Sequence, residues 1–145
     1  MHIEKISKLT EEVYSAVKLL VPQLGVHKVN PTWDELNALI RSESSKLIVA
    51  RYPDETSQIS GILTLAIYRV PTGMRSIVED VIVDEKKRRR GIAEALMRYA
   101  IDLAREAGAN GVALTSNPQR EAANRLYQAM GFQKRETNAY FYKLK

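Results

Sequence analysis

The sequence predicts an α/β fold in which helices cover both faces of a mixed sheet. Amphipathic helical patterns alternate with short apolar runs, and no repeat, low-complexity segment or interdomain linker interrupts them. Hydrophobic residues make up 45% of the 145 residues and charged residues 27%, which is ordinary for a globular protein with one core. We therefore expect residues 1–145 to form a single domain with the element order βααβββαβαββ.

The first half of the chain is expected to hold one strand, two helices and three further strands. Thr10 can cap a helix that ends before Pro22, because proline cannot continue it. Thr32 and Glu35 have the spacing of a capping box, which marks the start of the second helix. The predicted ranges are a strand at 2–6, helices between Thr10 and Pro22 and at 33–41, and strands at 46–52, 58–69 and 75–83.

The second half is expected to alternate helices with short strands. Apolar residues at helical spacing begin at Ile92 and stop at Gly108. A later helix has Pro118 in its first turn and Gly131 just past its end, which is the usual placement of both residues. The predicted ranges are a helix from Ile92 to Gly108, a short buried strand at 111–115, a helix at 118–130 and two strands at 133–144 around Thr137-Asn138.

A basic turn joins a strand to a helix near the middle of the chain. An apolar strand ending at Val83 is followed by the basic run from Lys86 to Arg90, and Gly91 then opens a helix. The first N–H groups of a helix have no partner within it, and the helix dipole adds positive charge there. Gly91 lets an oxygen approach the backbone, Ala93 keeps the rim shallow, and arginines supply forked donors. These features predict a phosphate-binding site.

The spacing Arg88-x-x-Gly91-x-Ala93 resembles the pyrophosphate-binding signature of the GNAT superfamily of N-acetyltransferases. The segment 124–132, Asn-Arg-Leu-Tyr-Gln-Ala-Met-Gly-Phe, is similar to a second block of that family. The resemblance covers about residues 46–145. It implies the GNAT fold, acetyl-CoA as cosubstrate and transfer of an acetyl group to a primary amine.

The resemblance also implies which residues hold acetyl-CoA. The pyrophosphate would bind at the basic turn, and main-chain groups of the preceding strand would pair with the pantetheine arm like an added strand. Asn124 resembles the family's residue that hydrogen-bonds the cofactor arm, and Tyr127 would lie near the sulfur. The implied cofactor-binding residues are Val81, Ile82, Val83, Arg88, Arg89, Arg90, Gly91, Ile92, Ala93, Asn124 and Tyr127.

Two side chains are candidates for catalysis. A lysine-like amine costs roughly 4 kcal/mol to deprotonate at neutral pH, so a carboxylate is needed to accept its proton. Glu79 is the candidate base, although it could equally face solvent, and Asp80 competes because a bulge in this strand would break the alternation. Tyr127 lies beside the apolar arc of its helix, and the resemblance makes its hydroxyl a general acid or hydrogen-bond donor to the departing thiolate.

The predicted function is acetyl-CoA-dependent N-acetyl transfer by direct attack in a ternary complex. The chain has no cysteine, which excludes an acyl-cysteine intermediate. His2 and His27 form no metal pair, and no ligand spacing predicts a metal site. The acceptor stays open between a small-molecule amine and a peptide amine.

The alternative is a non-catalytic CoA-sensing or nucleic-acid-binding domain on the same fold. The excess positive charge (net +5) is concentrated in Lys86 to Arg90, which is compatible with nucleic-acid binding or with a solvent-exposed turn. However, no aromatic residue lies between Tyr68 and Tyr99 to stack on bases. No signal peptide or bilayer-spanning run is visible, so a cytoplasmic protein without a membrane partner is expected. The resemblance is also compatible with a homodimer.

Overall fold

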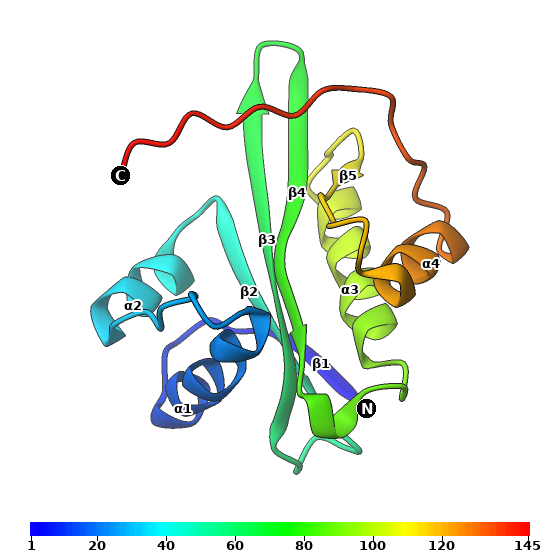
Figure 1. The fold of residues 1–145 in the computed structure, drawn as a ribbon. Helices are drawn as coiled ribbons and strands as arrows, with labels where there is room; N and C mark the ends of the chain where they lie inside the picture. The colour runs from blue at the N-terminus through cyan, green and yellow to red at the C-terminus, as the bar shows by residue number, and fades with distance from the viewer. The chain divides into compact units, whose positions relative to one another are not determined.

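The computed structural model describes residues 1–145 and divides into two compact units, Met1–Leu114 and Thr115–Lys145 (Figure 1). The first unit contains the sheet and the helices that cover it, and the second contains one helix and the C-terminal residues. The organisation as a single domain stays a prediction.

The first unit is built on one five-stranded sheet. Its strands are β1 (His2–Lys5), β2 (Ser45–Arg51), β3 (Ile59–Val70), β4 (Gly73–Val83) and β5 (Val112–Ala113). They are ordered as they occur in the chain, and neighbours are antiparallel except β4 and β5, which pair in parallel. The mixed sheet confirms the predicted fold class.

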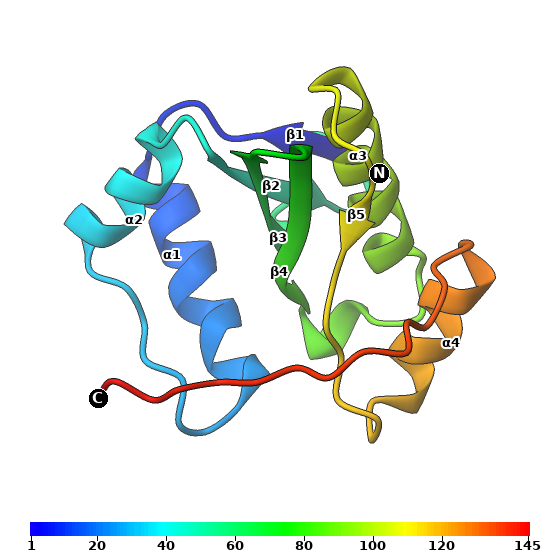
Figure 2. The same ribbon diagram turned by 90° about the horizontal axis from the view of Figure 1, so that it is seen from above.

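Helices cover both faces of this sheet, as predicted (Figures 1 and 2). The helices α1 (Glu11–Leu20) and α2 (Trp33–Arg41) lie on one face, and α3 (Ile92–Glu106) lies on the other. Two short 3₁₀ turns, η1 (Val21–Leu24) and η2 (Glu85–Lys87), follow α1 and β4.

Both predicted helix caps are confirmed. The Oγ1 atom of Thr10 accepts a hydrogen bond from the Val13 amide at 3.3 Å at the start of α1. At the start of α2, Thr32 Oγ1 accepts from the Glu35 amide at 3.1 Å, and the Glu35 carboxylate accepts from the Thr32 amide at 2.9 Å. These bonds satisfy N–H groups that a helix leaves unpaired at its N-terminus, so the starts of both helices are determined locally.

Apolar side chains fill the space between the sheet and the helices on each face. On the face of α1 and α2, Val13, Val17 and Leu20 belong to one buried cluster with strand residues that include Ile62 and Ile82. Each large side chain buried in this way contributes about 1.5–3 kcal/mol. On the other face, the buried residues of α3 are Ile92, Leu96, Met97, Ala100 and Ala104.

The β3–α3 contact is tightest at Gly61. A Cβ atom on this residue would lie 3.0 Å from Cγ2 of Ile92, 3.1 Å from Cδ1 of Leu96 and 3.3 Å from the carbonyl oxygen of Ile82. The absence of a side chain therefore lets α3 pack close to the sheet, with its first turn beside the end of β4.

Arg51 joins three segments at the end of β2. Its guanidinium donates to both carboxylate oxygens of Glu12, each at 2.7 Å, and to the carbonyl oxygen of Ser57 at 3.1 Å. It also lies 3.7 Å from the Glu4 carboxylate. The hydrogen bond from Arg51 holds the pKa of Glu12 below its usual value. This network ties α1 and β1 to the turn between β2 and β3.

The second unit contains α4 (Glu121–Ala129), which starts later than the predicted position at Pro118. The element order is confirmed through α4, but the structure differs for the final two strands: residues 133–145 form none, and the hairpin expected around Thr137-Asn138 is absent. An alternating pattern becomes a strand only where a neighbour supplies ladder hydrogen bonds. No backbone hydrogen bond is made within this segment.

We predict that Gly61→Ala lowers the free energy of unfolding by about 1–3 kcal/mol, because the added methyl group overpacks the contact between β3 and α3. Chemical denaturation measures this change. Gly111→Ala is the matched control, since a Cβ atom there meets nothing within 4 Å. Equal stability of the two variants would show that α3 does not pack this closely in solution.

Candidate functional site

A β-bulge interrupts β4 in the region where the sequence placed the base. The register pairs Thr64 with Glu79 and Ile62 with Ile82, so one extra residue lies on β4 between these pairs. Asp80, inside the bulge, has the left-handed φ of 50° that aspartate tolerates better than most residues. In a regular strand, residues three apart point to opposite faces, whereas the extra residue places Glu79 and Ile82 on the same face.

This bulge separates the two candidate bases. Glu79 shares the face of its partner Thr64, which is the face that α1 and α2 cover. Asp80 has no partner in the ladder. Both carboxylates are exposed, so each can reach solvent or a bound molecule. The geometry therefore favours Glu79 as the carboxylate that faces the α1–α2 side of the sheet.

The second half of β4 has a free edge. The parallel partner β5 pairs only with Ser76 and Ile77, so it leaves β4 before the bulge. The strand expected at 111–115 is accordingly short, and its two residues are not buried. From Val78 to Val83, β4 has a partner strand only on the side of β3. An extended molecule could pair with this exposed backbone.

The turn after β4 is organised by local hydrogen bonds. Asp84 accepts from the amides of Lys86 at 3.2 Å, through its carboxylate, and Lys87 at 2.8 Å, through its carbonyl. The Glu85 amide donates to the side chain of Gln23 at 2.9 Å, which fixes the turn against η1. These contacts precede the predicted phosphate site and set the direction in which the chain enters it.

The amides of this turn are free to bind an anion. Arg89 has a φ of 65° and Gly91, the N-cap of α3, a φ of 79°. A left-handed residue followed by a helical one directs successive N–H groups toward one point. The amides from Arg88 to Glu94 donate to no acceptor in the protein. Together with the N-terminus of a 15-residue helix, they form a positive backbone surface of the kind that binds phosphate.

The three arginines of the turn have different surroundings. Arg88 donates from Nε to the carbonyl oxygen of Val83 at 3.4 Å, so its side chain lies along the end of β4. The guanidinium of Arg90 lies over the ring of Tyr52, with 5.5 Å from Cζ to the ring centroid. Arg89 makes no such contact. All three are exposed and add positive charge to the free amides.

The remaining predicted residues lie on α4 in the second unit. The Asn124 side-chain amide donates to the carbonyl oxygen of Asn117 at 3.1 Å, so part of its hydrogen-bonding capacity is used locally. The side chain of Asn117 accepts from the Gln119 amide at 2.9 Å, in the turn before the helix.

Tyr127, which lies beside the apolar arc, is the buried residue of α4. Its ring packs edge to face against Phe132, with centroids 5.9 Å apart. Burial raises the pKa of the Tyr127 hydroxyl above its usual value, and the charge of Arg120 opposes this effect in part. The phenol therefore stays protonated throughout the neutral range and is a hydrogen-bond donor.

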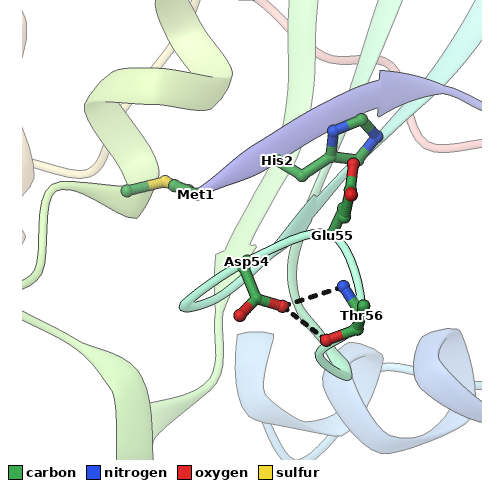
Figure 3. Close-up of a pocket in the computed structure, with 5 residues that line it drawn as sticks. All are labelled: Met1, His2, Asp54, Glu55 and Thr56. Carbon is green, nitrogen blue, oxygen red and sulfur yellow. Dashed lines mark hydrogen bonds between the residues drawn. The ribbon is translucent and has the colours of Figure 1, made fainter.

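One hollow in the first unit lies among residues to which the sequence assigned no functional role (Figure 3). Met1, His2, Asp54, Glu55 and Thr56 line this open hollow of about 440 Å³. Asp54 accepts hydrogen bonds from the amide and the hydroxyl of Thr56, at 2.9 and 2.6 Å, so its carboxylate is used within its own turn. These contacts stabilise the turn and occupy the Asp54 carboxylate.

Sequence reasoning missed the contact between Tyr52 and Arg90. The two residues belong to different turns, and nothing in the local sequence of either turn indicates the other. No group of three or more His, Asp and Glu side chains is placed so that it could hold a metal ion. No helix combines the length and the apolar character needed to cross a membrane.

Comparison with known proteins connects both units to one family. The sequence model of the acetyltransferase (GNAT) family matches residues 12–132. N-acetyltransferase family 8 member 2 of Rattus norvegicus is 36% identical over 86 residues, which are 58% of this chain and 37% of that protein. Human N-acetyltransferase 8 is 43% identical over 54 residues, 37% of this chain and 24% of that protein. The matched part is thus well under half the length of these relatives.

Solved structures show the same fold. An aminoglycoside acetyltransferase from an uncultured soil metagenomic sample, in complex with trehalose, has a TM-score of 0.86 at 18% identity, over 99% of this chain and 96% of that chain. A transcriptional regulator from Bacillus halodurans C-125 has a TM-score of 0.78 at 22% identity, over 98% of this chain and all of that chain.

Proposed function

Because the chain belongs to the acetyltransferase (GNAT) family, we propose that it transfers an acetyl group from acetyl-CoA to a primary amine by direct attack in a ternary complex. The observation that carries this proposal is the set of unpaired amides from Arg88 to Glu94 at the N-terminus of α3. Such a surface recognises the phosphates of a nucleotide-like cosubstrate.

The residues of the first unit fit two parts of acetyl-CoA, the pyrophosphate and the pantetheine arm. The pyrophosphate takes the free amides of the turn, with Arg88 and Arg89 as further donors. The pantetheine arm pairs with the main chain of Val81 to Val83 along the free edge of β4. This recognition uses backbone hydrogen bonds, so it depends on the edge being open rather than on particular side chains.

The amine needs a base, and we assign this role to Glu79. A lysine-like acceptor is protonated at neutral pH and can attack the thioester only after losing a proton. Glu79 lies on the α1–α2 face of the sheet, next to the β4 edge proposed for the pantetheine arm. It takes the proton directly or through a water molecule.

The departing thiolate needs a hydrogen-bond donor, and we assign this role to Tyr127. The raised pKa of its hydroxyl keeps the proton on the phenol oxygen. Since an ordinary thiol has a pKa of about 8.5, complete proton transfer from tyrosine to the thiolate is uphill. Tyr127 therefore donates a hydrogen bond that stabilises the thiolate and keeps its own proton. The proton of the amine is transferred to Glu79.

Acetyl-CoA should raise the melting temperature of the chain by several degrees. A ligand at about 100 times its dissociation constant adds about 2.7 kcal/mol of stability, measured by thermal denaturation. Adenosine 3′,5′-bisphosphate is the fragment control. In Gly91→Ala the shift should shrink, because a φ of 79° strains alanine by about 1–2 kcal/mol and distorts the turn.

If millimolar acetyl-CoA gives no shift, the proposed function is wrong. In that case salt-dependent titrations with DNA and RNA test the alternative, a nucleic-acid-binding domain that uses the run from Lys86 to Arg90. If the shift occurs, release of free CoA in the presence of a panel of amines identifies the acceptor.

Tyr127→Phe should lower kcat by about 10- to 100-fold, because a hydrogen bond to a charged group contributes about 1.5–3 kcal/mol. The dissociation constant of acetyl-CoA should change less than twofold. Both are measured with the acceptor found in the amine panel. The matched control is Tyr14→Phe, since the Tyr14 ring packs against Trp33 without using its hydroxyl. A Tyr127→Phe enzyme with full turnover would remove Tyr127 from the mechanism.

Glu79→Gln should reduce kcat/KM at pH 7. The kcat/KM of this variant should approach the wild-type value as the pH approaches 10. At that pH the amine loses its proton to the solvent and no longer needs the carboxylate. Profiles of kcat/KM against pH test this, with Asp80→Asn as the neighbouring carboxylate variant. If the Asp80→Asn enzyme shows the defect and the Glu79→Gln enzyme does not, the two assignments are reversed.

A further inference from the structure

We propose that Tyr52 is a positioning residue for the phosphate-binding turn and acts through Arg90. This inference rests on the proposed binding of acetyl-CoA. Within the turn, Arg90 differs from Arg88 and Arg89 because its guanidinium is held on an aromatic ring. This contact fixes the shape of the turn, and the fixed shape keeps the free amides directed toward the phosphates.

The sheet register brings the two turns together. Gly61 near the start of β3 pairs with Val83 near the end of β4, and the Asp84 amide donates to the Ser60 carbonyl at 2.8 Å. The turn between β2 and β3 and the turn between β4 and α3 therefore emerge from the same end of the sheet. Tyr52 directly follows β2 and is half-buried.

The contact has the geometry of a cation–π interaction. The distance of 5.5 Å from Arg90 Cζ to the Tyr52 ring centroid lies within the range in which the ring face attracts a cation. Five basic residues in succession, Lys86 to Arg90, repel one another. Placing one guanidinium against the electron-rich face of a ring moves its charge away from the others and lowers this repulsion.

The turn that carries Tyr52 is itself firmly held. The Asp54 carboxylate accepts from the amide and hydroxyl of Thr56, and the Asp54 amide donates to the Ser57 hydroxyl at 3.2 Å. Arg51, adjacent to Tyr52, binds the Ser57 carbonyl and both carboxylate oxygens of Glu12. The Tyr52 ring therefore stands on a braced turn and can restrain Arg90, rather than simply following its motion.

Restraint of the turn matters because its backbone is strained at Arg89. Arg89 adopts a left-handed φ of 65°, which costs a residue with a Cβ atom conformational energy. A loop that is already ordered binds its ligand more tightly, since less freedom is lost on binding. Tyr52 thus acts on affinity for the phosphates and not on the acetyl-transfer step.

The experiment compares Tyr52→Leu, which keeps apolar bulk without a π face, with Tyr52→Phe, which keeps the face. Calorimetry should give an acetyl-CoA dissociation constant about two- to fivefold higher for Tyr52→Leu, as expected for an exposed cation–π contact. For Tyr52→Phe it should stay within about 1.5-fold of wild type. S-acetyl-pantetheine, which lacks the phosphates, should bind all three proteins equally in NMR titrations.

A double-mutant cycle assigns the effect to Arg90. Arg90→Ala should weaken acetyl-CoA binding, and adding Tyr52→Leu to it should weaken binding no further. Arg105→Ala, which removes a positive charge at the far end of α3, is the control for net charge and should bind as wild type does. Melting curves verify that each variant is folded. If Tyr52→Leu does not fold, the comparison of Arg90→Ala with Arg105→Ala carries the test.

Three results would overturn the inference. Equal acetyl-CoA affinity of Tyr52→Leu and wild type would remove the role of Tyr52 and leave the proposed function intact. An equal loss of acetyl-CoA and S-acetyl-pantetheine binding would show a general structural defect. Failure of the wild-type chain to bind acetyl-CoA would overturn both this inference and the proposed function.

Discussion

The unpaired backbone at one end of β4 is the feature on which the proposed site depends. β5 pairs with β4 only at Ser76 and Ile77, and the amides from Arg88 to Glu94 have no acceptor in the protein. Polar backbone groups that lack a protein partner must bond water or a ligand. Here they form two stretches, an open strand edge and a helix N-terminus, separated by the paired amides of Asp84 to Lys87. An extended molecule with phosphates at one end fits their order along the chain.

That stretch is held in place by packing at some distance from it. Gly61 lets α3 lie close to β3, which brings the helix N-terminus beside the end of β4. The bulge at Asp80 changes which residues of β4 face α1 and α2, and so turns Glu79 to that side. The ion pair of Arg51 and Glu12 braces the neighbouring turn that carries Tyr52. Each of these contacts joins segments far apart in the chain.

Local signals in the sequence predicted most of the secondary structure and the position of the turn with free amides. The caps at Thr10 and Thr32 lie within a few residues of the helices they start, and Gly91 opens α3 at the expected position. By contrast, the strands expected in residues 133–144 are absent, because a strand is stabilised by its neighbours and not by its own pattern. On α4, Tyr127 is buried although it lies beside the apolar arc.

The sequence by itself determined the fold class, the family and the segment with free amides, because caps, glycine conformations and the basic run act over a few neighbouring residues. Only the tertiary structure decided which face of the sheet Glu79 lies on, since that depends on how β4 aligns with β3. It alone brought Tyr52 to Arg90, since that contact joins two turns that meet only when the sheet forms. Backbone conformation is encoded locally, whereas register and the contacts between turns depend on partners that the chain meets only on folding.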